Sequence, residues 1–155
     1  MGIKVYIEDD LGREFTNHEW AISDTKALAD VFLQKNYFKV IETYFRIDFV
    51  ALNKIQYFDE IEKPEDKLWF QVWQVIEDVK RLKRVMKPPE YPSEISPFVM
   101  LHQTAFKMFE ISKERPDFTI DYFIFGYLLL DLDDLERLLY YLLHSGAKQV
   151  HFYCS

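Results

Sequence analysis

The chain has 155 residues, of which 49% are hydrophobic and 29% charged, a composition typical of a folded domain. Its 26 acidic residues exceed its 19 lysines and arginines and give a net charge of −7. That charge disfavours direct binding to nucleic acids or to anionic membranes, because both attract cationic surfaces. The start of the chain shows no secretory signal, and no apolar stretch is long enough to cross a bilayer. With Cys154 as the only cysteine, we expect one soluble, cytoplasmic domain over residues 1–155 without an internal disulfide.

The first 58 residues predict a hairpin, a helix and one ambiguous stretch. Residues 3–7 alternate as a strand does, and a turn containing Gly12 leads to a return strand at 13–16. A helix follows from a cap at Ser23 or Asp24 through Phe45, with a break expected at Asn36. Residues 47–58 fit either strand or helix, with a hairpin turn at Asn53-Lys54 as one reading.

The clearest helical pattern begins at Pro64 and ends before Pro88. Its apolar residues are spaced alternately four and three apart, and two tryptophans widen the stripe. The members of this stripe are Leu68, Trp69, Val72, Trp73, Val75, Ile76, Val79, Leu82 and Met86. Pro88-Pro89 ends the helix because proline has no amide hydrogen to donate.

The C-terminal third predicts a helix at 96–113, a strand at 118–125, a helix from Asp131 and a closing strand at 149–154. A helical reading of 118–130 stays open, and Gly146 is placed to end the last helix. The predicted fold is therefore α+β: a small sheet with about four helices and a C-terminal strand–helix–strand unit. A mostly α fold is the alternative.

Catalytic, nucleotide and metal motifs are missing from the sequence. The four glycines lie far apart, so no phosphate-binding loop of the Walker or Rossmann type is present. No serine sits in a nucleophile elbow, and the histidines lack metal-ligand spacing. Cys154 and His151 would point to opposite faces of a strand. His102, on an apolar helical stripe, is the histidine best placed to line a pocket. We therefore expect no cofactor and no metal.

Charged residues gather in clusters. The first acidic cluster is Glu8-Asp9-Asp10. The acids that we select as binding candidates come from the second and third clusters: Asp59, Glu60, Glu62, Asp131, Asp133, Asp134 and Glu136. Acids at helix starts complement the helix dipole, and the same carboxylates can meet a cationic partner. Five cations without an acid among them form the only candidate anion patch: Lys80, Arg81, Lys83, Arg84 and Lys87.

Aromatic residues are abundant, with 14 Phe, 10 Tyr and 3 Trp, and many are adjacent in pairs such as Tyr57-Phe58 and Phe152-Tyr153. Two neighbours cannot both face one core, so some aromatics must reach the surface or a partner. The sequence leaves catalysis open and favours a non-enzymatic domain, of the immunity, antagonist or adaptor type, that binds a protein partner through an acidic, aromatic-rich surface. Such a surface suits a basic partner. The alternatives are a small enzyme or ligand-binding domain with a pocket near His102, and a homo-oligomer that buries the surplus aromatics.

Overall fold

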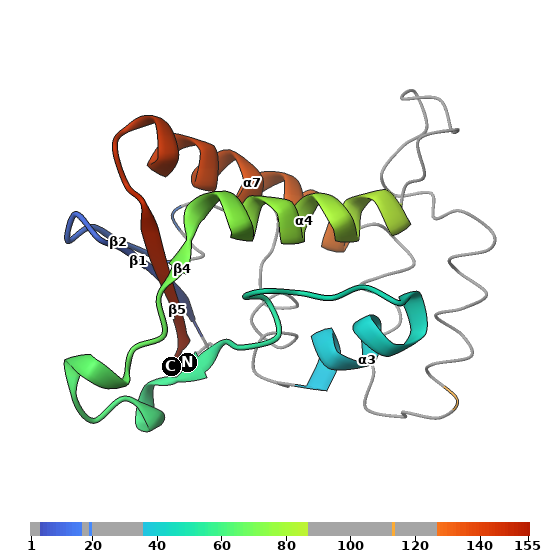
Figure 1. The fold of residues 1–155 in the computed structure, drawn as a ribbon, viewed down its shortest axis with the longest axis horizontal. Coiled ribbons are helices and arrows are strands. Elements are labelled where there is room, and N and C mark those ends of the chain that lie inside the picture. The colour runs from blue at the N-terminus through green and yellow to red at the C-terminus, as the bar shows by residue number, and fades with distance from the viewer. Residues whose placement is uncertain (1–3, 17–18, 20–35, 87–112, 114–126) are drawn as a thin grey trace.

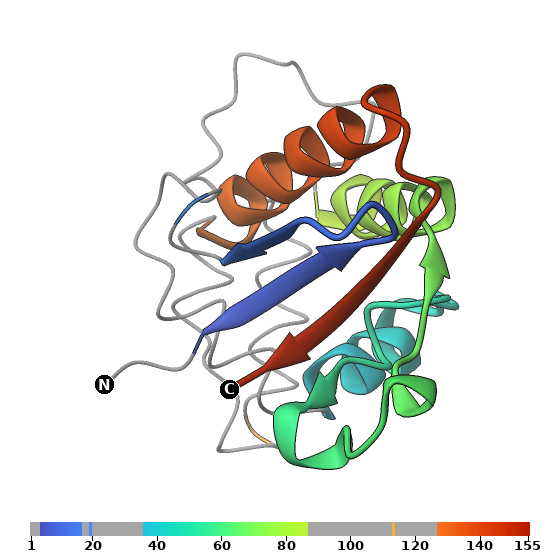
Figure 2. The same ribbon diagram turned by 90° about the vertical axis from the view of Figure 1, so that its left-hand side faces the viewer.

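The computed structural model describes residues 4–16, 19, 36–86, 113 and 127–155. These residues form a five-stranded mixed sheet and three α-helices, and the helices lie on one side of the sheet (Figure 1). Figure 2 shows the same arrangement with the strands in front and the helices behind. The predicted α+β class is therefore confirmed.

The N-terminal hairpin forms as the alternating pattern predicts. Strands β1 (Val5–Asp9) and β2 (Glu14–Thr16) pair antiparallel. Gly12 has φ of 82°, a left-handed conformation that glycine adopts without steric cost. The buried carboxylate of Asp9 accepts the backbone N–H of Leu11 at 3.0 Å and of Arg13 at 2.9 Å, which fixes the turn.

Strand β5 (Gln149–Cys154) is the centre of the sheet, and the predicted closing strand is thus confirmed. It pairs antiparallel with β1 on one side. On its other side it pairs parallel with β3 (Gln56–Tyr57) near its end and antiparallel with β4 (Phe70–Gln71) near its beginning. The last strand of the chain therefore joins segments that are far apart in sequence.

The described helices are α3 (Asn36–Phe45), α4 (Val72–Met86) and α7 (Tyr127–His144). The described part of the chain thus holds three helices, two of them long, where about four were expected. The expected helix at 96–113 lies almost wholly outside the described residues, and so does the expected strand at 118–125. Of the predicted C-terminal unit, the last helix and the last strand are seen.

Helix α4 begins later than predicted, and the start at Pro64 is wrong. Residues Pro64–Asp66 make one turn of 3₁₀ helix (η2), and the chain then extends into β4 because it pairs with β5. Leu68 and Trp69 are consequently not on the helix. Trp73, expected to widen the apolar stripe, is 55% exposed. The rest of the described stripe is buried as predicted: Val72, Val75, Ile76, Val79 and Leu82.

Helix α7 begins earlier than predicted. It already includes Tyr127, so Asp131 lies in its second turn, and its first turn contains no acidic residue. Asp133 and Glu136 are therefore inside the helix and not at its start, where the sequence placed the acids of this cluster. The leucines at 128–130 continue the apolar pattern and extend the helix backwards. Gly146, with φ of 101°, follows the helix end as predicted.

The ambiguous stretch 47–58 is mostly loop. Its turn spans Ala51 to Lys54, where the Lys54 N–H donates to the Ala51 carbonyl at 2.9 Å. Only Gln56 and Tyr57 are in a strand, and they pair with β5 instead of forming a local hairpin. The asparagine–lysine pair lacks the glycine that a tight two-residue hairpin favours.

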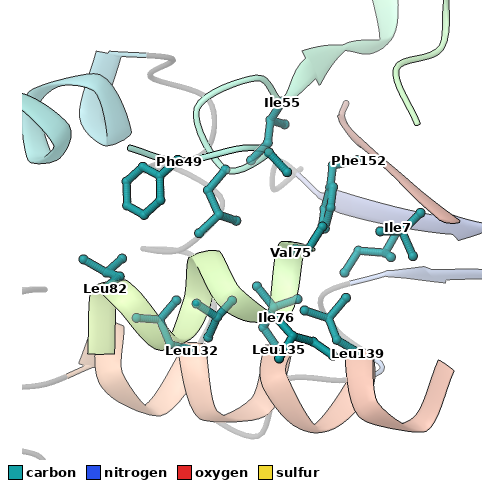
Figure 3. Close-up of a cluster of buried hydrophobic side chains, with 14 of the residues drawn as sticks. Ile7, Phe49, Ile55, Val75, Ile76, Leu82, Leu132, Leu135, Leu139 and Phe152 are labelled. Carbon is teal, nitrogen blue, oxygen red and sulfur yellow. The ribbon is translucent and has the colours of Figure 1, made fainter. Parts of the chain in front are cut away.

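The core fills the space between the sheet and the helices (Figure 3). Ile7 and Phe152 reach into it from the strands, and Val75 and Leu139 come from α4 and α7. Because side chains alternate along a strand, the intervening residues of β1 and β5 point to the opposite face of the sheet. That outer face carries Tyr6, Glu8, His151 and Tyr153.

Candidate functional site

The outer face of the sheet carries a row of contacting aromatic rings. Tyr6 of β1 and Tyr153 of β5 are paired residues, and their rings stack at 4.6 Å between centroids with 4° between planes. Phe58, in the 3₁₀ turn η1 (Phe58–Glu60), lies 6.0 Å from the Tyr153 ring and is 59% exposed. An aromatic surface therefore runs from β1 across β5 to η1.

His151 lies within the same row and is completely buried. Its ring centroid is 5.5 Å from that of Tyr153 and 5.8 Å from that of Trp69. Nδ1 is 3.0 Å from the Leu68 carbonyl oxygen, so the neutral tautomer that donates from Nδ1 fits this contact. Nε2 is buried without a hydrogen-bond partner. Burial lowers the pKa of His151, because the charged imidazolium would be desolvated there. We call Tyr6, Phe58, Trp69, His151 and Tyr153 the outer aromatic cluster.

Polar groups frame this cluster. The Tyr153 hydroxyl donates to the Glu14 carboxylate at 2.8 Å, and burial together with this bond raises the pKa of Tyr153 above its ordinary value. Lys67 forms an ion pair with Glu8 at 3.0 Å. Gln56 holds the segment that covers His151, since its side-chain amide donates to the Asp66 carbonyl and accepts from the Leu68 N–H.

The second acidic cluster lies beside the aromatic row. Asp59 and Glu60 follow Phe58 within η1, and their side chains and that of Glu62 are exposed. Asp66 serves the local fold, because its carboxylate accepts the N–H groups of Glu62 and Lys63 at 3.1 and 3.0 Å. The segment 58–66 holds five acids and one lysine, so it gives this end of the outer face a negative charge.

The third acidic cluster contacts cations of the same molecule. Lys83 of α4 forms ion pairs with Asp133 and with Glu136, the latter at 2.7 Å. Desolvation opposes the charge of Lys83, yet these two carboxylates raise its pKa. Asp134 pairs with Arg137 at 2.8 Å, and Asp131 and Asp134 are both buried. Much of the charge of this cluster is thus balanced inside the fold.

The four described cations of the candidate anion patch do not lie on one face of α4. Lys80 lies over the Tyr140 ring at 5.4 Å, and a hydrogen bond with Tyr140 raises the pKa of Lys80. Lys80 and Lys83 thus meet α7, whereas Arg81 and Arg84 turn toward residues 45–50. Lys87 and His102 lie outside the described residues.

A buried carboxylate that the sequence reading missed connects α4 to the loop after α3. Asp78 is completely buried and accepts the N–H groups of Val50, Ala51 and Leu52 at 2.7–3.2 Å. It also accepts from Arg81 at 3.0 Å. A buried carboxylate that accepts from several N–H donors holds the surrounding backbone in place. The signal in the sequence was an acid three residues after Val75, on the buried stripe.

Cys154 and His151 point to opposite faces of β5, as the strand geometry predicts. Burial raises the pKa of the Cys154 thiol to about 12, so little thiolate forms at neutral pH. The described residues contain no group of three or more ligands that could hold a metal ion, and no described helix is long and apolar enough to cross a membrane.

Comparison with known proteins adds no relative: no protein-family model, curated protein or solved structure matches the chain.

Proposed function

We propose that the protein is a non-enzymatic binding domain and that the outer aromatic cluster, with the acids at 59, 60 and 62, holds a basic protein partner. The observation that carries this proposal is Phe58, a large apolar side chain that is 59% exposed and adjoins the stacked Tyr6 and Tyr153 rings. Aromatic residues are enriched at the centres of protein interfaces, where few side chains supply most of the binding energy.

The charges around Phe58 favour a cationic partner. Asp59 and Glu62 are exposed beside it, whereas the acids of α7 are engaged by Lys83 and Arg137. Exposed charges at an interface rim mainly speed association and select the partner. The partner's own basic residues would therefore set specificity, and the aromatic rings would set the affinity.

The test is recovery of partners from native lysate with the wild type, Phe58→Ala and Trp73→Ala. Trp73 is the matched control, because it is an aromatic side chain of similar exposure on α4. We expect a basic protein that the wild type and Trp73→Ala retain and that Phe58→Ala binds about thirtyfold more weakly, as for a residue worth roughly 2 kcal/mol at an interface. Partners that bind all three proteins equally would contradict the proposal.

A charge variant separates the rim from the centre. Asp59→Asn combined with Glu62→Gln should slow association and reduce its dependence on salt, because exposed charges are screened over about 10 Å at 0.1 M salt. Sedimentation of the wild type at rising concentration distinguishes a foreign partner from a second copy. Self-association that Phe58→Ala abolishes would assign the face to a homo-oligomer instead.

A further inference from the structure

A second candidate site lies away from the outer face, in a groove of about 720 Å³ between the end of α3 and the second half of α4. Figure 1 shows α3 and the second half of α4 on the side of the molecule away from the hairpin. The groove is lined by Phe45, Arg46, Ile47, Asp48, Val50, Arg81 and Arg84. Three arginines thus line one groove in a protein whose net charge is −7.

Arg46 occupies an unusual backbone position. It directly follows α3 with φ of 54°, and it is the one described residue other than glycine with a positive φ. The next residue, Ile47, donates its N–H back to the Glu42 carbonyl at 3.1 Å, which closes the helix end. Glycine or asparagine normally occupies such a position, because other side chains cost about 1 kcal/mol or more there. Strained residues of this kind cluster at functional sites.

Arg81 is held in a fixed orientation. Its Nη1 donates to the Asp78 carboxylate and to the Asp48 carbonyl, each at 3.0 Å. Asp78 is itself fixed by three backbone amides, so the guanidinium is oriented before any ligand arrives. A guanidinium has five N–H donors, and among the described residues no partner is seen for the other N–H groups of Arg81.

The groove combines a positive charge with an apolar wall. Arg84 makes one hydrogen bond with its side chain, from Nε to the Lys80 carbonyl at 3.3 Å. Arg46 has no ion pair among the residues that the structure describes. Asp48 is the one carboxylate on the lining, and Arg81 also pairs with the buried Asp78, so two carboxylates offset part of the charge of the three arginines. The remaining positive charge suits an anion, and arginine forks fit the oxygens of phosphate. Phe45 can contact an apolar part of the same ligand.

We infer that this groove binds a small soluble ligand that carries a phosphate group. The test uses phenyl phosphate and inorganic pyrophosphate as probes, with binding measured by calorimetry at low salt. Arg46→Asn removes a cation but keeps a residue that tolerates positive φ, and Arg84→Gln keeps a good helix former. We expect each of these variants to weaken binding roughly tenfold.

Two further variants test the charge balance of the groove. Asp48→Asn removes the opposing carboxylate and should strengthen binding severalfold, an outcome that loss of folding cannot imitate. Lys148→Gln removes one exposed cation outside the groove and should leave the affinity unchanged. Thermal unfolding of every variant shows whether it is folded.

Three results would overturn the inference. The first is that neither probe binds the wild type at millimolar concentration. The second is binding that Arg46→Asn and Arg84→Gln leave unchanged. The third is association with vesicles that contain phosphorylated inositol headgroups and no binding of the free probes, because the groove would then serve a membrane surface.

Discussion

The two faces of β5 differ in chemistry and in what covers them. On the inner face, Val150, Phe152 and Cys154 are buried in the core that also contains residues of α4 and α7. On the outer face, His151 and Tyr153 stack on each other, and their neighbours are aromatic, acidic or amide side chains. One six-residue strand therefore serves the hydrophobic core on one side and the candidate binding surface on the other.

This difference shows why aromatic content alone does not indicate a binding surface. Phe152 and Tyr153 are adjacent in sequence, yet Phe152 is 2% exposed in the core while Tyr153 is partly exposed and hydrogen-bonded to Glu14. Adjacent aromatics on a strand separate to opposite faces, and the faces then have different roles. Substitutions on the inner face should act on stability, and those on the outer face mainly on binding.

The largest expected effect is that of Phe152→Ala. Removing a buried phenyl ring loses its transfer free energy and leaves a cavity, so we expect the free energy of unfolding to fall by about 3–5 kcal/mol. The measurement is urea denaturation followed by tryptophan fluorescence. Tyr153→Phe is the matched variant on the other face and should cost less than about 1 kcal/mol, because it loses one exposed hydrogen bond to Glu14. Equal costs for the two variants would contradict the division of β5 into two faces.

A smaller effect is expected from pH, through His151. Burial lowers the pKa of this histidine in the folded protein below its ordinary value of about 6.5. Below that value the unfolded chain binds the proton more readily, so the folded state loses stability as the pH falls from 6.5 to the lower folded pKa. A single proton limits the slope to about 1.4 kcal/mol per pH unit.

The measurement compares unfolding free energies of the wild type and His151→Gln across this pH range. The variant keeps a side chain able to donate to the Leu68 carbonyl but cannot titrate, so its pH dependence should be weaker than that of the wild type. Identical pH profiles for the two proteins would show that His151 is not held neutral in the fold.

Local patterns predicted the parts of the fold that depend on neighbouring residues. Three features could be predicted from the sequence: the strand from the alternation in residues 3–7, the turn at Gly12, and the buried stripe from Val72 to Leu82. Hydrophobic spacing and turn-forming residues are local properties of the chain. The residue at which α4 begins could not be predicted from the sequence. Phe70 and Gln71 form a strand because they pair with β5, about 80 residues later in the chain, and such pairing leaves little local signal.

The candidate site was less predictable than the fold. The acids around residue 60 were selected from the sequence, but those of α7 were selected equally, and only the structure shows Lys83 and Arg137 beside the latter. The His151 environment was missed because its neighbours come from three separate segments. Arg46 was missed as well, since positive φ at an arginine has no sequence signature.

The smallest effect expected is the coupling between Tyr6 and Tyr153. Their parallel stacking at 4.6 Å should contribute about 0.5–1.5 kcal/mol beyond the separate burial of each ring, measured as the interaction energy of a double-mutant cycle with Tyr6→Leu and Tyr153→Leu. The cycle cancels the loss of the Glu14 hydrogen bond, which occurs in both proteins that lack Tyr153. Tyr6 paired with Trp73 in a second cycle is the control and should show no coupling. A coupling near zero for the tyrosine pair would mean that the rings are not held together before binding, and the ordering of the outer aromatic cluster would then have to come from its partner.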